Sequence, residues 1–365
     1  MIESMVDRRR ILLGMGAVMS FPAIQAKAGE SAFGQRLAQL QNEGRVSGVH
    51  ALLVSRQGSM LFAYYGTGED QSWGQPLGTV AFDPTVLHDL RSVTKSIVGM
   101  LYGIALADGK VPPPEAKLYD QFPQYADLAK EPGRDRLTVA HVLSMTLGLE
   151  WDELTYPYGD PRNSENKMEA APDRYRYILS LPVVQEPGVK WTYCGGATAI
   201  LGHLIARGTG EKLTEYARRV LFDPLGLGPT GWSIDRTGEP RAASGGRMRP
   251  PDLLRVGQMV LAEGAWQGKQ VVPAEWLKRS TTAVVTIEGV RRYGWHWYVS
   301  DLSLGSSGRV ERMISAIGWG GQRLFLVPAL ELAVAINCGN YPKPGLEQGR
   351  IVSALLSEVV LPGLG

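Results

Sequence analysis

Ser92 and Lys95 are the two residues of this chain whose types and spacing favour covalent catalysis. A serine hydroxyl is a useful nucleophile only when a nearby base accepts its proton. A lysine can be that base when burial or nearby positive charge lowers its pKa. Because residues three apart share one face of a helix, the spacing predicts a nucleophile–base pair. Alternatively, Ser92 only caps a helix and Lys95 is a surface residue.

The sequence around Ser92 supports the first interpretation. An apolar run with helical periodicity follows this serine and ends at Gly109. The free N–H groups and the positive dipole at the start of such a helix favour a developing oxyanion. The same S-x-x-K pattern recurs at Ser164 and Lys167, but there it lies in a polar stretch without periodicity. Only the first copy is therefore predicted to be reactive.

The segment 151–173 is expected to be a long loop, rich in charged residues and proline. Long loops in compact domains often act as lids or binding loops. Tyr156 and Tyr158 are candidates for substrate contact on this loop. The alternative is a solvated surface loop without a role in binding.

Strand signals occur at both ends of the chain, and helical periodicity dominates residues 92–280 between them. We expect an α+β fold, in which the terminal strands form one antiparallel sheet flanked by helices. Residues 29–91 and 281–365 would form this sheet lobe, residues 92–280 a mainly helical lobe, and the active site would lie in the cleft between them. The predicted elements are helices 31–43 and 346–360 and strands 48–55, 59–65, 293–299, 312–317, 323–327 and 331–337.

The segment 88–96 resembles the first motif of the serine β-lactamase and penicillin-binding-protein superfamily. It is most similar to the branch of class C β-lactamases, family VIII carboxylesterases and nylon-oligomer (6-aminohexanoate-dimer) hydrolases. Residues 137–149, 224–227 and 244–253 resemble further motifs in the same order, so that the resemblance covers roughly residues 45–360. It implies a β-lactamase-like fold and an acyl-serine mechanism in which Ser92 is the nucleophile and Lys95 its partner.

The resemblance maps the catalytic tyrosine of the Y-x-N motif onto Tyr193. A tyrosine beside Lys95 can take the serine proton and return it to the leaving group. The alternative is a core tyrosine with a backbone partner. Gly195 replaces the asparagine, whose amide helps β-lactamases to hold the substrate's amide side chain. Efficient lactam turnover is therefore not expected.

Trp319-Gly320-Gly321 stands where the family carries K-T-G or H-x-G. The two glycines let a substrate approach the backbone closely, and Trp319 offers an apolar wall. The N–H of Gln322 is the expected second oxyanion donor, beside that of Ser92. Because the cation that meets a substrate carboxylate is missing, the resemblance favours neutral esters or amides.

The composition excludes several other functions. The formal net charge is +2, from 38 basic and 36 acidic residues, and no basic stripe occurs, so a nucleic-acid partner is not expected.

The G-x-G-x-x-G pattern at 226–231 follows a helix and contains Pro229, which argues against a dinucleotide site. The five histidines lack metal-ligand spacing, and neither a metal nor a cofactor is expected. Cys194 and Cys338 are packing residues or a disulfide pair.

Residues 1–28 resemble a twin-arginine export signal. Arg8, Arg9 and Arg10 precede an apolar run, 11–24, which is shorter than the ~20 residues that span a bilayer. The alternatives are a buried N-terminal helix and a retained membrane anchor. Removing residues 1–28 would leave 34 basic and 34 acidic residues and no stable membrane span. The predicted location is periplasmic or extracellular.

Together these patterns predict an exported serine hydrolase that cleaves a small-molecule ester or amide through an acyl-serine intermediate. A β-lactamase or D-amino-acid peptidase is one alternative. A non-catalytic binding protein on the same scaffold is another. The sequence does not indicate an oligomeric state.

Overall fold

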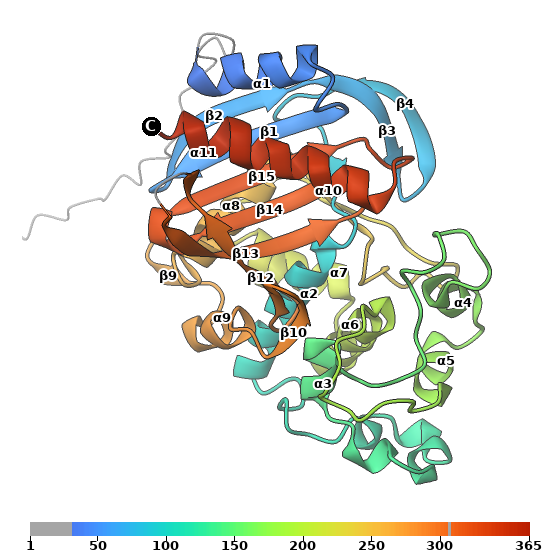
Figure 1. The fold of residues 1–365 in the computed structure, drawn as a ribbon. Coiled ribbons are helices and arrows are strands. Elements are labelled where there is room, and N and C mark those ends of the chain that lie inside the picture. Colours follow the sequence, from blue (N-terminus) through green and yellow to red (C-terminus); the bar gives the residue numbers. More distant parts are fainter. Residues whose placement is uncertain (1–30, 306–307) are drawn as a thin grey trace, which may run out of the picture.

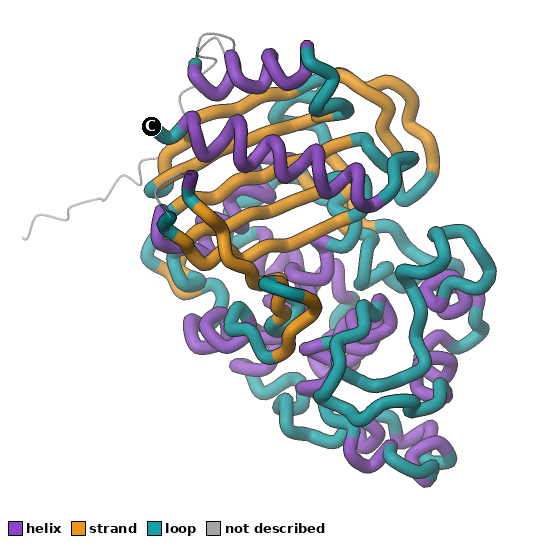
Figure 2. The backbone as a smooth tube through the Cα atoms, in the orientation of Figure 1, coloured by secondary structure: helices purple, strands orange, loops and turns teal. Residues whose placement is uncertain are grey.

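A computed structural model describes residues 31–305 and 308–365, and an antiparallel sheet forms its centre (Figures 1 and 2). The predicted α+β class is confirmed, because both ends of the chain contribute strands to this sheet. In spatial order the strands are β10 (Val285–Glu288), β11 (Arg291–Tyr293), β12 (Tyr298–Ser303), β13 (Val310–Gly318), β14 (Gln322–Val327), β15 (Leu332–Cys338), β1 (Val49–Arg56) and β2 (Ser59–Tyr65).

Smaller sheets and helices complete the fold. The remaining strands are β3 (Thr67–Ser72) paired with β4 (Gln75–Ala81), β5 (His88–Asp89) and β6 (Gly231–Trp232) on either side of β7 (Gly246–Met248), and β8 (Ala265–Trp266) paired with β9 (Lys269–Gln270). The α-helices are α1 (Ala32–Asn42), α2 (Val93–Ala107), α3 (Val139–Ser144), α4 (Ser164–Ala170), α5 (Arg174–Ser180), α6 (Gly195–Thr209), α7 (Leu213–Ala217), α8 (Pro250–Leu261), α9 (Ala274–Ser280), α10 (Gly345–Ala354) and α11 (Leu361–Gly363).

The central strands are buried on both faces because helices cover both sides of the sheet. Successive side chains of β1 alternate between two cores, with Leu53 in one and Leu52 in the other, as the two-residue period of a strand requires. Helices α1 and α10 cover one face (Figure 1). Helix α8 packs against β1, β14 and β15, and α2 packs against β13. This doubly covered sheet is the rigid support of the segment that carries Ser92.

The structure differs from the predicted elements in two places that matter for the site. The expected strand 293–299 is interrupted, because His296 adopts a left-handed φ of 62° and the N–H of Gly294 donates to the carbonyl of Trp297. The expected loop 151–173 contains α4, which begins at Ser164 after the side chain of Asn163 caps it. Local polarity concealed this short helix.

The boundaries of the two lobes stay a prediction. Helix α8 falls within 92–280, the predicted helical lobe, but packs on the sheet. The order of the elements in the chain therefore does not separate the sheet lobe from the helical lobe cleanly. Within residues 31–305 and 308–365, no helix combines the length and apolar character needed to cross a bilayer. The export signal predicted for residues 1–28 lies outside the described residues.

Candidate active site

Ser92 lies at the first turn of α2, at the meeting point of the sheet and the helices. It occupies the N-cap position, yet its side chain makes no capping hydrogen bond. The preceding residue, Arg91, has a left-handed φ of 49°, a conformation that costs energy in a non-glycine residue and clusters at functional sites. The hydroxyl of Ser92 is therefore presented to other side chains and not to the helix backbone.

Lys95 is held against Ser92 one helical turn later. Its side-chain nitrogen Nζ donates to Ser92 Oγ at 3.0 Å and to the carbonyl of Ala243 at 3.0 Å. The side chain is buried. The loop that supplies Ala243 is fixed to α2, because the N–H of Gly246 donates to Thr94 Oγ1 at 3.1 Å. The predicted placement of serine and lysine on one helical face is confirmed.

Tyr193 approaches Ser92 from the segment that precedes α6. Its Oη donates to Ser92 Oγ at 2.6 Å, and Lys95 Nζ lies 4.9 Å from the centre of its ring. The backbone here is tied to the 137–149 segment, since the N–H of Thr192 donates to the carbonyl of Met145 at 2.9 Å. Burial, together with the nearby Glu153 carboxylate, raises the pKa of the Tyr193 phenol well above its ordinary value. The phenol is therefore neutral in the resting site.

Two buried carboxyl groups stand beside these three side chains. Glu153 accepts hydrogen bonds from the N–H of Gly195 at 2.6 Å, from Trp151 Nε1 at 3.0 Å and from Tyr158 Oη at 3.0 Å. Burial and the neighbouring Glu153 raise the pKa of the Glu165 carboxyl to about 8. Glu165 therefore holds the proton that the two groups share.

The carboxyl pair lies close to Gly195, the residue that stands where the resemblance expects an asparagine. A Cβ added to Gly195 would lie 3.2 Å from Glu153 Oε2 and 3.2 Å from Glu165 Oε1. Sequence reasoning missed this pair. The only signal was the number of acidic residues between 150 and 169, and those residues read as a solvated surface.

A pocket of about 550 Å³ opens at Ser92 and is large enough for a small molecule. Aromatic side chains form much of its wall, and the indole of Trp319 meets the ring of Tyr158 edge-on at 5.8 Å. A second pocket, of about 510 Å³, is lined by parts of α6 and α7 and contains none of the groups described above. The residues that line the Ser92 pocket are Gln71, Trp73, Gly74, Arg91, Ser92, Tyr158, Gly159, Glu165, Asn166, Glu169, Ser244, Trp319, Tyr341 and Pro342.

Three predicted site residues, Gly320, Gly321 and Gln322, are not among the residues that line this pocket. Gln322 is fully buried in β14, where its side chain donates to the carbonyl of Cys338 at 2.7 Å. Gly320 and Gly321 pack behind Trp319, against Tyr341 and Cys338. The arrangement follows from a tight β13–β14 hairpin, which presents Trp319 to the pocket and turns the residues after it inward.

The remaining candidates have structural surroundings. The guanidinium of Arg162 lies over the ring of Tyr156, 4.2 Å from the ring centre. Tyr156 is not among the residues that line the pocket. Ser164 Oγ accepts from the N–H of Asp152 at 2.9 Å, so the second S-x-x-K copy has a turn-forming serine. Cys194 and Cys338 are both buried free thiols.

The chain resembles known proteins over most of its length. The sequence model of the Beta-lactamase family matches residues 33–353. The 6-aminohexanoate-dimer hydrolase of Paenarthrobacter ureafaciens is 25% identical over 346 residues, which cover 87% of this chain and 81% of that hydrolase. Esterase EstB of Burkholderia gladioli is 26% identical over 205 residues, covering 53% of this chain and 49% of the esterase.

Solved structures show the same fold. EstCE1, described as a hydrolase with promiscuous acyltransferase activity, superimposes with a TM-score of 0.65 at 16% identity, over 88% of this chain and 98% of EstCE1. The octameric penicillin-binding protein homologue from Pyrococcus abyssi gives 0.64 at 17% identity, over 89% and 76% of the two chains. The resemblance noted in the sequence is confirmed, and the chain belongs to the Beta-lactamase family.

Proposed function

We propose that this protein is a serine hydrolase that cleaves uncharged esters or small amides through an acyl-serine intermediate. The observation that carries the proposal is the position of Ser92 Oγ, 3.0 Å from Lys95 Nζ and 2.6 Å from Tyr193 Oη at a pocket mouth. A nucleophile, a base and a proton-bearing hydroxyl in mutual contact are the parts that acyl transfer needs.

In the first half-reaction, Ser92 Oγ attacks the substrate carbonyl and its proton passes to Lys95 in the neutral amine form. Tyr193 donates its proton to the departing alcohol or amine and recovers one from the Lys95 ammonium. Water then attacks the acyl-serine, loses a proton to the same pair, and Ser92 leaves with its proton restored. Because the phenol of Tyr193 is neutral, it first donates its proton to the leaving group and only then accepts a proton from Lys95.

The oxyanion of each tetrahedral intermediate needs two aimed donors. We assign these to the backbone N–H groups of Ser92 and Trp319. Both residues line the pocket, and neither amide donates a hydrogen bond to any other group in the described part of the chain. Trp319 follows directly after Gly318, whose added Cβ would lie 2.4 Å from the carbonyl of Leu90, so the end of β13 adjoins the Ser92 turn. Trp319 takes the place expected for Gln322.

The charge of the pocket favours substrates without a carboxylate. Glu169 lines it and is paired with Arg241, whose Nε lies 3.0 Å from its carboxylate, and the cation of the family's third motif is missing. Arg91 also lines the pocket, but its charge is balanced by Asp89, whose Oδ2 lies 3.1 Å from Arg91 Nε. A β-lactam antibiotic carries a carboxylate and would find no unpaired cation among the residues that line this pocket. An ester or amide with neutral substituents needs none.

We also propose that the protein is exported, on the strength of the sequence of residues 1–28 alone. Replacing Arg8 and Arg9 by lysine should retain the protein in the cytoplasmic fraction of an expressing bacterium, while the wild type reaches the periplasm. Equal distribution of both proteins would exclude a twin-arginine route.

A fluorophosphonate probe tests the catalytic proposal. The wild type should be labelled on one serine, and Ser92→Ala should not be labelled. Ser164→Ala is the matched control, because Ser164 belongs to the other S-x-x-K copy, and it should be labelled like the wild type. Equal labelling of Ser92→Ala and wild type would overturn the assignment.

Substrate class is tested with two chromogenic compounds. The wild type should hydrolyse p-nitrophenyl butyrate and leave a chromogenic cephalosporin largely intact. Strong cephalosporin turnover without ester hydrolysis would instead support a β-lactamase.

A further inference from the structure

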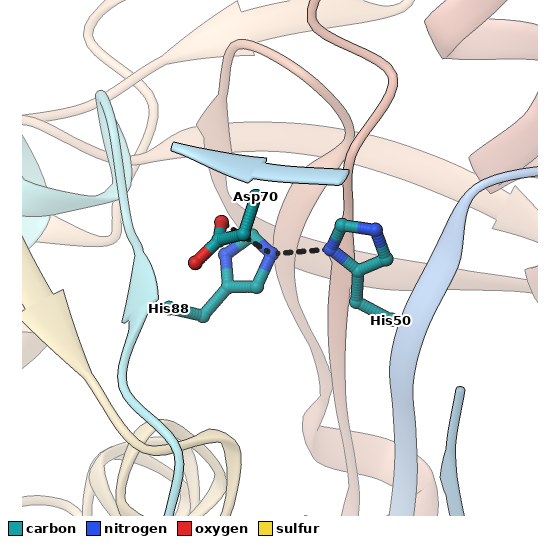
Figure 3. Close-up of side chains that lie close together, drawn as sticks. All are labelled: His50, Asp70 and His88. Carbon is teal, nitrogen blue, oxygen red and sulfur yellow. Dashed lines mark hydrogen bonds and ion pairs between the residues drawn. The ribbon is translucent and has the colours of Figure 1, made fainter. Parts of the chain in front are cut away.

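Three side chains from distant parts of the chain lie together, and one of them is on the short strand β5 that precedes Ser92 (Figure 3). They are His50 on β1, Asp70 on β3 and His88 on β5, so each comes from a different sheet. His50 Nδ1 lies 2.9 Å from His88 Nε2, and His88 Nε2 lies 3.9 Å from Asp70 Oδ1. The three atoms all lie within 4.8 Å of one another.

The hydrogen bonds around His88 define which nitrogen can bind a metal. His88 Nδ1 lies 2.9 Å from the backbone carbonyl of Asp89, which accepts a hydrogen bond from it. In the neutral ring, Nε2 therefore carries a lone pair, and this lone pair faces the other two groups. A histidine fixed by a hydrogen bond from its second nitrogen to a carbonyl is the usual arrangement of a metal ligand.

The contact between the two rings follows from the same tautomer of His88. Without a metal, His50 Nδ1 donates a hydrogen bond to His88 Nε2. Metal binding moves the proton of this hydrogen bond to His50 Nε2, a change of tautomer that releases no proton from the pair.

Asp70 supplies the independent observation that points to a cation. Its side chain is buried, and Oδ1 has no hydrogen-bond partner within the described residues. Arg247 binds the other oxygen, Oδ2, at 3.0 Å and also donates to Asp89 Oδ1 at 2.7 Å. A buried carboxylate oxygen without a donor is costly. A cation between Oδ1 and the two imidazoles would satisfy it.

We propose that His50, Asp70 and His88 bind one zinc ion. Two imidazole nitrogens and one carboxylate oxygen suit Zn²⁺, whereas Ca²⁺ and Mg²⁺ favour oxygen ligands. A tetrahedral ion with ligands at about 2.1 Å separates neighbouring ligand atoms by roughly 3.4 Å. The His50–His88 and His88–Asp70 separations of 2.9 Å and 3.9 Å lie on either side of this value, and all three atoms lie within 4.8 Å of one another. Side-chain shifts would bring them to an ion, and a solvent molecule would fill the fourth position.

The position of the site indicates a structural role. Zinc would join β1, β3 and β5, and β5 leads through Leu90 and Arg91 directly to Ser92. Phe82 stacks on the ring of His50 with centroids 4.3 Å apart and closes one side. The three ligands would act as positioning residues that hold the nucleophile segment. The spacing of histidines in the sequence predicted no such site, because its members are brought together only by the strands.

Metal binding to the full-length wild type is the direct test. The protein is stripped with a chelator and dialysed, then titrated with Zn²⁺ or Co²⁺. One Zn²⁺ per chain should bind, the melting temperature should rise, and Co²⁺ should show the visible ligand-field bands of a four-coordinate site. Failure of the folded wild type to bind stoichiometric metal would overturn the proposal, whatever its hydrolase activity.

Variants locate the site. His50→Asn and Asp70→Asn should each weaken zinc binding by on the order of 10- to 100-fold or more. His203→Asn is the control, because His203 stacks against Tyr175 and Phe122 far along the chain from the site, and it should bind zinc like the wild type. Unchanged affinity in both folded ligand variants would overturn the assignment. If these variants do not fold, the Co²⁺ spectrum of the wild type decides.

Discussion

Replacing Glu165 with glutamine isolates the energetic effect of the shared-proton pair beside the nucleophile. Glutamine keeps the shape of the side chain and mimics the protonated carboxyl at every pH. It can still donate a hydrogen bond to Glu153, whose three other donors are unaffected. The substitution therefore removes one titrating group and changes little else in the site.

The sign of the effect follows from the pKa of Glu165, which rises from 4.5 in the unfolded chain to about 8 in the folded protein. A carboxyl with a raised folded pKa stabilises the fold fully below pH 4.5, and this contribution is lost as the pH rises towards 8. At about 1.4 kcal/mol per pKa unit, the ceiling is roughly 5 kcal/mol. Because the two carboxyls are coupled, the effect is on the order of a few kcal/mol.

Urea unfolding at about pH 5 and about pH 9 measures this difference. The free energy of unfolding of Glu165→Gln minus that of the wild type should increase by a few kcal/mol between the two pH values. Taking the difference cancels the other groups, including His50, His88 and His296, whose lowered pKa values stabilise the fold as the pH rises.

Glu150→Gln serves as the control, because Glu150 is exposed. Its difference from the wild type should not change with pH. A pH-independent difference for folded Glu165→Gln would refute the reasoning, since it would mean that Glu165 is ionised at neutral pH in the native protein.

Three further predictions concern the same region. Tyr193→Phe should lower kcat for p-nitrophenyl butyrate on the order of 10²- to 10⁴-fold while the circular dichroism spectrum stays unchanged; a rate within a factor of about two of the wild type would remove Tyr193 from the mechanism. Gly195→Asn should lower the melting temperature without restoring cephalosporin hydrolysis, because the new Cβ would lie 3.2 Å from oxygens of Glu153 and Glu165; a gain in lactam turnover would contradict the proposed role of the carboxyl pair. Ellman's reagent should label no thiol in the native protein and two after denaturation, because Cys194 and Cys338 are buried free thiols; immediate labelling of either would contradict their burial.

Some of this protein could be predicted from the sequence because the signals are local. Helical periodicity after Ser92 placed Lys95 on the same face, and the structure has the two side chains 3.0 Å apart. Alternating and continuous apolar runs predicted the strands near both ends, because a strand buried on two faces contains few polar residues. The resemblance to known motifs placed Tyr193, which no local pattern would have chosen over other tyrosines.

The tertiary structure alone decided the environment of these residues. Glu153 and Glu165 read as surface charges until the fold buried them against Tyr193 and Gly195. Which backbone N–H between Trp319 and Gln322 faces the pocket depends on the conformation of the hairpin after β13. The sequence does not specify that conformation. Local periodicity carries no information on pairs so far apart in the chain, because burial and hydrogen bonding arise only when the strands and helices pack.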